Sequence, residues 1–296
     1  MRSQKKVSYL EEEKVRKNVR EGYAKIAKDG LCCSPTNSCC DGPTTYEERS
    51  KKMGYTKEEL KSIPEGANLG LGCGNPVALA SLKEGETVID LGSGAGVDCF
   101  LAARKVGEKG RVIGVDMTPE MINKARENAR KGNYKNVEFR LGEIENLPVA
   151  DNTADVIISN CVVNLAPNKR RVFEEAFRAL KPGGRLMVSD IVLLKELSET
   201  LKKRAHPAGC IQGAIMKDEY IETIERAGFQ NVKIIGETQH SFEDVANDPN
   251  AKVIVADPNK KTQKFKSVSE LEEEAKEIVR DALTSTMSIN VLAVKS

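Results

Sequence analysis

The segment from Thr87 to Gly96 restricts the fold of this chain more than any other part of the sequence. It reads TVIDLGSGAG, a short apolar strand that runs into a glycine-rich turn, and the helical pattern of Val97 to Val106 follows directly. Glycines at such a turn let backbone N–H groups approach a ligand and let the helix pack closely on the strand. From this turn to Asp190, strand-like and helix-like segments alternate. The pattern predicts an α/β fold with a doubly wound, mostly parallel sheet covered by helices.

Composition narrows the expected partners of the chain. The formal net charge is +2, from 46 basic and 44 acidic residues, and aromatic residues make up 4% with no tryptophan. Because the charges nearly balance and base-stacking side chains are few, nucleic acid is not an expected partner. The sequence has no apolar run of about 18 residues, the length that a membrane helix needs, and no apolar stretch follows its basic N-terminus. We therefore expect no membrane partner and a cytoplasmic location.

Three stretches are expected along the chain. Residues 1–80 combine an amphipathic helix, a cysteine-rich loop and a segment that covers the ligand. Residues 81–195 form the predicted cofactor-binding core. Residues 196–296 hold the substrate-binding segment, the last sheet strands and a peripheral region, in which Asp244 to Lys266 reads as polar and irregular. The loop cysteines are Cys32, Cys33, Cys39 and Cys40.

The acid before the glycine turn indicates the kind of cofactor. The glycines follow the spacing G-x-G-x-G at Gly92, Gly94 and Gly96, and Asp90 stands just before them. A carboxylate here would repel a pyrophosphate but attract the ammonium and sulfonium groups of S-adenosylmethionine. The pattern therefore favours S-adenosylmethionine as cofactor, in contact with Asp90, Ser93 and the three glycines.

Later strand ends extend this predicted cofactor site. The second strand ends in an acid about twenty residues after the glycines, the offset at which a carboxylate accepts hydrogen bonds from ribose hydroxyls. An acidic loop follows the third strand, where it can meet an adenine edge. Each acid alone also fits a solvated surface, but the matches in order favour a cofactor site. The further predicted contacts are Asp116, Met117, Glu143, Ile144, Glu145 and Asn160.

Three cysteines lie where a fold of this type places its active site. Cys161 follows the end of the fourth strand, Cys210 lies after the fifth strand, and Cys73 stands in a glycine-rich stretch before the first. Inside a cell, the eight cysteines are expected as thiols. Three thiolates suit a soft centre such as trivalent arsenic. A core position is the alternative for each of the three, and it is the expected one for Cys99, inside an apolar helix.

Several motifs together resemble the arsenite methyltransferases, a family of class I S-adenosylmethionine-dependent methyltransferases. They are VREGY at Val19, GLGCGNP at Gly70, DLGSG at Asp90, VDMT at Val115, SNCVVNL at Ser159 and GC at Gly209. The resemblance spans about Val19 to Gly236 and implies a seven-stranded, Rossmann-like methyltransferase sheet with an N-terminal helical extension and a C-terminal appended region.

The resemblance also implies the substrate and the partners. Cys73, Cys161 and Cys210 would bind arsenic, delivered as arsenite or as thiol-conjugated arsenic(III). Cys33 or Cys32 would supply a further thiol. Methylation oxidises arsenic, so thioredoxin or a small thiol would act as reductant. The number of methyl groups added, from one to three, stays open.

Two other functions share parts of this pattern. A methyltransferase that acts on carbon or oxygen of a quinone-like or sterol-like molecule would carry the same cofactor motifs but would have no need of three thiols. A non-catalytic metalloid-binding protein would hold arsenite without consuming the cofactor.

Overall fold

The computed structural model of this chain is described over residues 9–29, 46–204, 209–239, 241–243, 252–256, 263–267 and 271–296. The helices are α1 (Tyr9–Asp29), α2 (Tyr46–Lys52), α3 (Lys57–Lys61), α4 (Pro76–Leu79), α5 (Val97–Val106), α6 (Pro119–Lys131), α7 (Lys169–Ala179), α8 (Glu199–Arg204), α9 (Cys210–Gly213), α10 (Lys217–Arg226) and α12 (Glu273–Ser285), with the 3-10 turn η1 (Val163–Leu165). The strands are β1 (Thr87–Leu91), β2 (Arg111–Asp116), β3 (Val137–Leu141), β4 (Ala154–Asn160), β5 (Leu180–Leu193), β6 (Gln230–Thr238), β7 (Lys252–Ala256), β8 (Gln263–Ser267) and β9 (Thr286–Val294).

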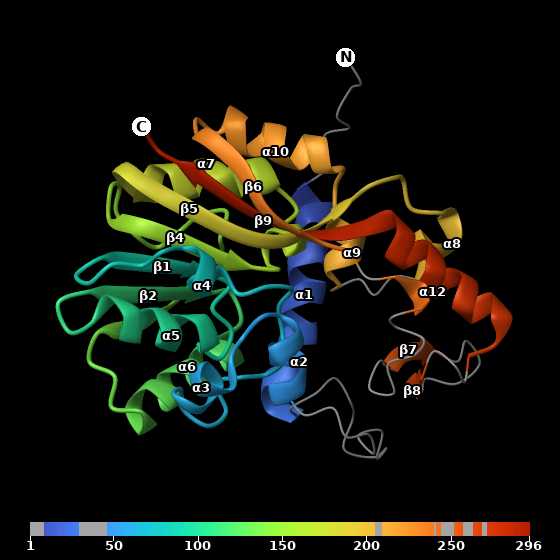
Figure 1. The fold of residues 1–296 in the computed structure, drawn as a ribbon, viewed down its shortest axis with the longest axis horizontal. Coiled ribbons are helices and arrows are strands. Elements are labelled where there is room, and N and C mark those ends of the chain that lie inside the picture. The colour runs from blue at the N-terminus through green and yellow to red at the C-terminus, as the bar shows by residue number, and fades with distance from the viewer. Residues whose placement is uncertain are drawn as a thin grey trace.

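Seven of the strands form one sheet in the order β3-β2-β1-β4-β5-β9-β6 (Figure 1). Strands β1 to β5 pair in parallel, whereas β9 inserts antiparallel between β5 and β6. The chain order reverses between β1 and β4, and ligands bind beyond the carboxyl ends of the strands at such a point. The predicted seven-stranded, mostly parallel sheet is confirmed.

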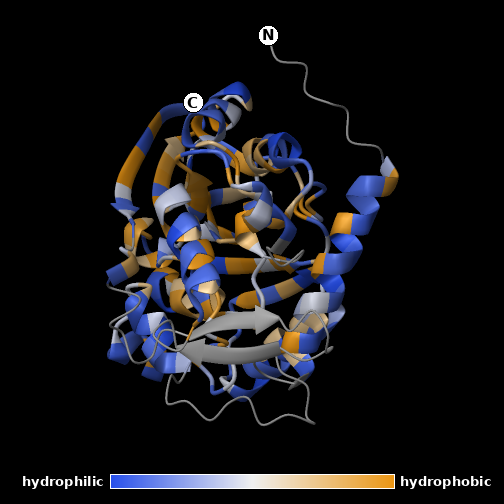
Figure 2. Cartoon of the chain, turned by 90° about the vertical axis from the view of Figure 1, so that its right-hand side faces the viewer, coloured by the Kyte–Doolittle hydropathy of each residue, from blue (hydrophilic) through white to orange (hydrophobic). Residues whose placement is uncertain are grey.

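Alternating side chains of the strands enter two separate cores, one on each face of the sheet. Ile89 and Leu91 of β1 belong to the core that includes residues of α7 and α10, while Val88 belongs to the core that includes residues of α5 and α6. Strands covered on both faces read as continuous apolar runs, as TVIDL does here. Figure 2 shows the orange, hydrophobic residues gathered on the inner strands and the blue, hydrophilic residues on the outer helices.

Helix α1 crosses the end of the sheet and packs against the core (Figure 1). Ala27 forms a small apolar cluster with Met121 of α6, and Val19 packs against Leu165 of η1. The N-terminal helix therefore covers the carboxyl ends of the strands, which is the edge at which a ligand is expected.

The C-terminal region differs from the expectation at one point. The segment from Asp244 to Lys266, expected to be irregular, contains β7 and most of β8, which pair antiparallel with each other. The β-branched run Val253-Ile254-Val255 favours a strand, and the polar residues around it hid this signal. The helical stretch expected up to Cys210 includes α8, and α9 begins at Cys210; residues 205–208 between them lie outside the described residues. Cys32, Cys33, Cys39 and Cys40 lie outside the described residues. Among the described helices, none is long and apolar enough to span a membrane.

Candidate active site

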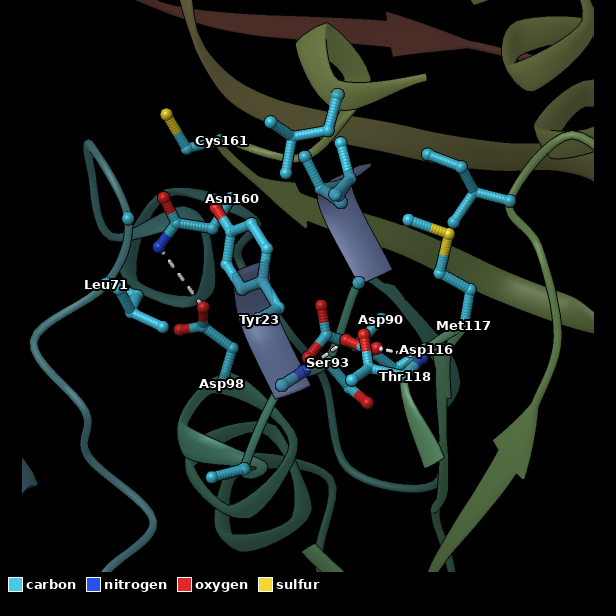
Figure 3. A pocket seen from close by; sticks show the side chains of 18 of the residues that line it. Tyr23, Leu71, Asp90, Ser93, Asp98, Asp116, Met117, Thr118, Asn160 and Cys161 are labelled. Carbon is cyan, nitrogen blue, oxygen red and sulfur yellow. Dashed lines mark hydrogen bonds between the residues drawn. The ribbon is translucent and has the colours of Figure 1, made fainter. Parts of the chain in front are cut away.

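A cavity of ≈ 290 Å³ opens at the carboxyl ends of β1, β2 and β4. Helix α1, the segment 67–72 and the turns after these strands supply its walls. In Figure 3, Cys161 lies toward one end of the cavity and Asp116 toward the other. Most of the predicted cofactor contacts line it, namely Asp90, Gly92, Ser93, Gly94, Asp116, Met117, Ile144, Glu145 and Asn160.

Two predicted contacts, Gly96 and Glu143, do not line the cavity. Gly96 precedes α5 with φ 101, and a Cβ there would lie 2.6 Å from the ring of Phe100. Its role is to let the helix pack closely. Glu143 forms ion pairs with Arg16 (Nε–Oε2 3.5 Å) and Arg20 (Nη2–Oε1 3.5 Å) of α1. It therefore helps to hold the covering helix.

Gly92 brings the glycine turn against the loop that follows β4. Its φ of 69 lies in the left-handed region, and a Cβ there would lie 2.3 Å from Cγ2 of Val162. Only glycine fits this contact without displacing Val162, the residue next to Cys161. The turn thus connects the cofactor side of the cavity to the thiol side.

Two buried carboxyl groups, Asp90 and Asp98, lie beneath the glycine turn. Asp90 accepts a hydrogen bond from the Cys99 thiol (3.2 Å), and Asp98 accepts one from the Tyr55 hydroxyl (2.7 Å). Burial raises the pKa of Asp98 to about 6, and burial together with the nearby Asp98 raises the pKa of Asp90 well above its usual range. A cation in the cavity would favour the ionised forms of both groups. This part of the site therefore suits a positively charged ligand.

Asp116 stands at the end of β2, where two backbone donors orient its carboxylate. The N–H groups of Gly94 and Thr118 donate to its two oxygens at 3.0 and 2.8 Å. Burial raises the pKa of Asp116, and these hydrogen bonds oppose the rise. The carboxylate lines the cavity at a strand end, so that it can accept hydrogen bonds from a ribose.

Helix α1 supplies a charged and an aromatic residue to the cavity. Arg16 forms an ion pair with Glu145 (Nη2–Oε1 3.3 Å), and both residues line the wall. Tyr23 is seen between Asn160 and Ser93 in Figure 3. Burial, followed by the nearby Cys210 and Cys161, raises the pKa of Tyr23 well above its usual range, so its hydroxyl stays neutral.

Three thiols from distant parts of the chain meet at the edge of this cavity. The Cys161 thiol donates to the sulfur of Cys210 (Sγ–Sγ 3.1 Å), and the Cys210 thiol donates to the carbonyl of Cys161 (3.2 Å). The sulfurs of Cys73 and Cys161 lie within 4.8 Å of each other. Cys161 and Cys210 line the cavity itself. Cys99 is buried in the core, as expected.

The backbone at Cys161 is unusual for a residue with a side chain. Its φ is 60, in the left-handed region, and its N–H donates to the carbonyl of Ser189 on β5 at 2.7 Å. Such a conformation costs of order 1–3 kcal/mol and persists where the surroundings enforce it. With this backbone, the sulfur of Cys161 lies 3.1 Å from that of Cys210 and within 4.8 Å of that of Cys73.

Asn160 fastens the loop that carries Cys73 to the end of β4. Its side-chain oxygen accepts hydrogen bonds from the N–H groups of Cys73 (2.9 Å) and Gly74 (3.3 Å). Its amide nitrogen donates to the Gly74 carbonyl (2.8 Å) and to Asp98 (3.2 Å). Figure 3 shows the contact with Asp98. Asn160 thus joins the thiol cluster to the acidic part of the cavity.

Asp190 lies in β5, one residue beyond the part of the strand that pairs with β4, and adds a buried carboxylate beside the thiols. One of its oxygens lies within 4.8 Å of the sulfurs of both Cys73 and Cys161. Four donors surround its two oxygens: the backbone and side-chain N–H groups of Asn164, the backbone N–H of Ile191 and the hydroxyl of Tyr220. Burial raises the pKa of Asp190 to about 6.

Sequence reasoning missed several residues of the site. Asp98 carries a weak signal, an acid in the first turn of the helix after the glycine turn. Tyr23 ends the motif VREGY of the predicted amphipathic helix, and nothing in that motif distinguishes a residue that lines the cavity. Asp190 lies within β5, which continues to Leu193, and only the folded sheet brings its carboxylate beside Cys73.

Comparison with known proteins gives the same class of fold. Residues 82–228 match the model of a family described as a methyltransferase domain. A solved structure of an arsenic(III) S-adenosylmethionine methyltransferase from Chlamydomonas reinhardtii superimposes with a TM-score of 0.59 at 27% identity, covering 86% of this chain and 75% of that one.

Two curated relatives are similar over most of the chain. An arsenite methyltransferase of Halobacterium salinarum is 51% identical over 231 residues, which are 75% of this chain and 59% of that protein. An arsenite methyltransferase of Aquipseudomonas alcaligenes is 35% identical over 238 residues, 77% of this chain and 66% of the relative. The matched regions thus span roughly three fifths to two thirds of these proteins.

Proposed function

We propose that this chain, a homologue of the arsenite methyltransferases, transfers the methyl group of S-adenosylmethionine to trivalent arsenic held by Cys73, Cys161 and Cys210. The observation that carries the proposal is the meeting of three thiols, distant in sequence, at the edge of the cavity. A quinone or sterol methyltransferase has no use for such a cluster.

The lining of the cavity fits S-adenosylmethionine. The acids Asp90 and Asp98 would hold the positively charged part of the cofactor, and Asp116 would accept hydrogen bonds from its ribose. The Ile144 to Glu145 stretch would border its adenine. When bound, S-adenosylmethionine supplies a methyl group that is activated by the sulfonium charge.

The thiols are suited to exchange with arsenite in their neutral form. Hydrogen bonding to Cys210 and Cys73, together with burial, raises the pKa of Cys161 well above its usual range. For Cys73, hydrogen bonding to Cys161 opposes the rise, but burial and Asp190 outweigh it, so that the pKa of Cys73 is also raised. Three thiols and arsenous acid give a neutral arsenic trithiolate and three waters. The exchange therefore needs no general base.

Methyl transfer then depends on holding the two reactants together. The arsenic keeps its lone pair and uses it to form the As–C bond, while the thiolates hold the arsenic in place. This step makes arsenic pentavalent. The sulfurs of Cys161 and Cys210, 3.1 Å apart, can then leave as a disulfide and return one electron pair to arsenic. A water or a small thiol takes the vacated position and loses a proton, so that a neutral methylated arsenic(III) remains bound to Cys73. Thioredoxin or a small thiol would reduce the disulfide.

The direct test is incubation of the chain with arsenite, S-adenosylmethionine and a thiol reductant, followed by speciation of the arsenic. We expect methylated arsenicals, and none from the variant in which Cys73, Cys161 and Cys210 are all serine. Unmethylated arsenic and unconsumed cofactor would favour a metalloid-binding protein. Turnover that survives the triple replacement would contradict the role of the thiols.

Asn160 is expected to affect both the thiol cluster and the rate. Asn160→Ala removes the acceptor for the N–H groups of Cys73 and Gly74, so the Cys73 loop loses its link to β4. Because a misplacement of about 1 Å costs around 10²-fold in rate, we expect kcat to fall by roughly that factor. Steady-state kinetics measures the fall.

As a control, Asn136→Ala removes two hydrogen bonds far from the cavity and is expected to lower stability by about 1–3 kcal/mol without lowering kcat.

A further inference from the structure

We infer that the carboxylate of Asp190 stabilises the positive charge that develops on arsenic during methyl transfer. The inference rests on the proposed function and adds to it a residue that neither binds the arsenic nor lines the cavity. It starts from the position of Asp190. The carboxylate is fully buried, and one of its oxygens lies within 4.8 Å of the sulfurs of both Cys73 and Cys161.

The hydrogen bonds around Asp190 identify its charge state and exclude a role as ligand. Asn164 N (3.2 Å) and Tyr220 Oη (3.2 Å) donate to one oxygen, and Asn164 Nδ2 (2.8 Å) and Ile191 N (2.9 Å) donate to the other. All four groups are donors, which matches an ionised carboxylate. Because the oxygens are already engaged, the carboxylate is a fixed negative charge and not a fourth arsenic ligand.

The charge changes during the transfer explain why this position matters. Before transfer the arsenic trithiolate is neutral and the donor sulfonium carries the positive charge. As the As–C bond forms from the arsenic lone pair and the donor S–C bond breaks, the electron pair of that bond stays on the donor sulfur. The positive charge thereby moves to the arsenic. A buried anion beside two arsenic-bound sulfurs interacts more favourably with this product state than with the neutral trithiolate, so it lowers the barrier.

Lys169 offers a second way to change the electrostatic effect of Asp190, because its positive charge partly compensates the negative charge of the carboxylate. Its ammonium lies close enough to Asp190 that each favours the ionised form of the other, and burial lowers the pKa of Lys169. The ammonium donates to the carbonyl of Ala166 (3.3 Å), and Lys169 is not part of the cavity wall. Removal of this cation would leave the negative charge of Asp190 less compensated.

The experiment compares arsenite binding with single-turnover methyl transfer in Asp190→Asn. The wild-type chain is measured first, because absence of methylation there refutes the proposed function and not this inference. For Asp190→Asn we expect arsenite binding, measured by calorimetry, to stay within about threefold, since the trithiolate is neutral. The methyl-transfer rate should fall roughly 10²-fold, as for loss of one preorganised electrostatic group. A rate within threefold of wild type, or an equal loss of binding and rate, would overturn the inference.

Two further variants separate charge from structure. Tyr220→Phe removes one donor but keeps the carboxylate, so its rate should fall far less than that of Asp190→Asn. A fall as large as that of Asp190→Asn would mean that the network matters only for packing. If Asp190→Asn does not fold, Lys169→Met decides: a two- to fivefold faster transfer supports the inference, and an unchanged or slower transfer overturns it.

Discussion

Replacement of Cys161 by serine is expected to abolish arsenic methylation while cofactor binding is retained. Cys161 is the central thiol, in contact with Cys210 at 3.1 Å and with its sulfur within 4.8 Å of that of Cys73. A hydroxyl is a hard donor and a poor ligand for arsenic(III). Because positioning of two reactants contributes 10⁵-fold or more in well-oriented reactions, we expect kcat/KM to fall by at least about 10³-fold. Steady-state kinetics with arsenite measures it, and calorimetry with S-adenosylmethionine should show an unchanged affinity.

The matched control is the same replacement at Cys99. This buried thiol donates to Asp90 and takes no part in the cluster, and a serine there keeps a donor for the same carboxylate. Cys99→Ser should lower stability by about 1–2 kcal/mol, as buried substitutions commonly do, and should keep most of the activity. If Cys99→Ser and Cys161→Ser lost activity equally, thiol loss would act through folding and not through arsenic.

Gly92→Ala is expected to lose both stability and cofactor binding. The new methyl group would lie 2.3 Å from Cγ2 of Val162, at a residue whose φ is 69. The left-handed backbone costs about 1 kcal/mol for alanine and the overpacking about 1–3 kcal/mol, so we expect a loss of about 2–4 kcal/mol in the free energy of unfolding. Since the turn and Val162 both line the cavity, the dissociation constant of S-adenosylmethionine should rise roughly 100-fold. Denaturant unfolding and calorimetry measure the two effects.

Two variants show whether the contact with Val162 is the cause. Gly85→Ala introduces a methyl group at φ 84 with no atom within 4 Å, outside the cavity, so only the backbone cost of about 1 kcal/mol should appear. Val162→Ala combined with Gly92→Ala removes the close contact and should recover part of the affinity. A double variant as weak as Gly92→Ala would assign the loss to the backbone alone.

The sequence predicts well those parts of the site that depend on local pattern and on the sheet. The run TVIDLGSGAG determines β1, the glycine turn and α5, and parallel strands bring Asp90 and Asp116 to one edge. Cys161 could be expected there for the same reason. These features depend on periodicity and on the rule that ligands bind at the carboxyl ends of strands.

Other parts of the site depend on tertiary contacts that no local pattern reports. The position of the Cys73 loop comes from Asn160, 87 residues away in the chain, and the carboxylate of Asp190 is set by Asn164 and Tyr220. Gly96 and Glu143 match the expected pattern but serve helix packing and the ion pairs of α1. Spacing identifies which residues can reach a site, whereas side-chain packing decides which of them do.

The last strand links assembly of the thiol cluster to completion of the fold. The hydroxyl of Ser288 in β9 donates to the carbonyl of Cys73 at 3.0 Å, across 215 residues of sequence, and β9 enters the sheet between β5 and β6. A chain that has not yet inserted its C-terminal strand therefore lacks an assembled trithiol. A ligand that binds only the native state shifts the folding equilibrium by mass action. Under the proposed function, arsenite bound to the three thiols would therefore favour chains in which the last strand is in place.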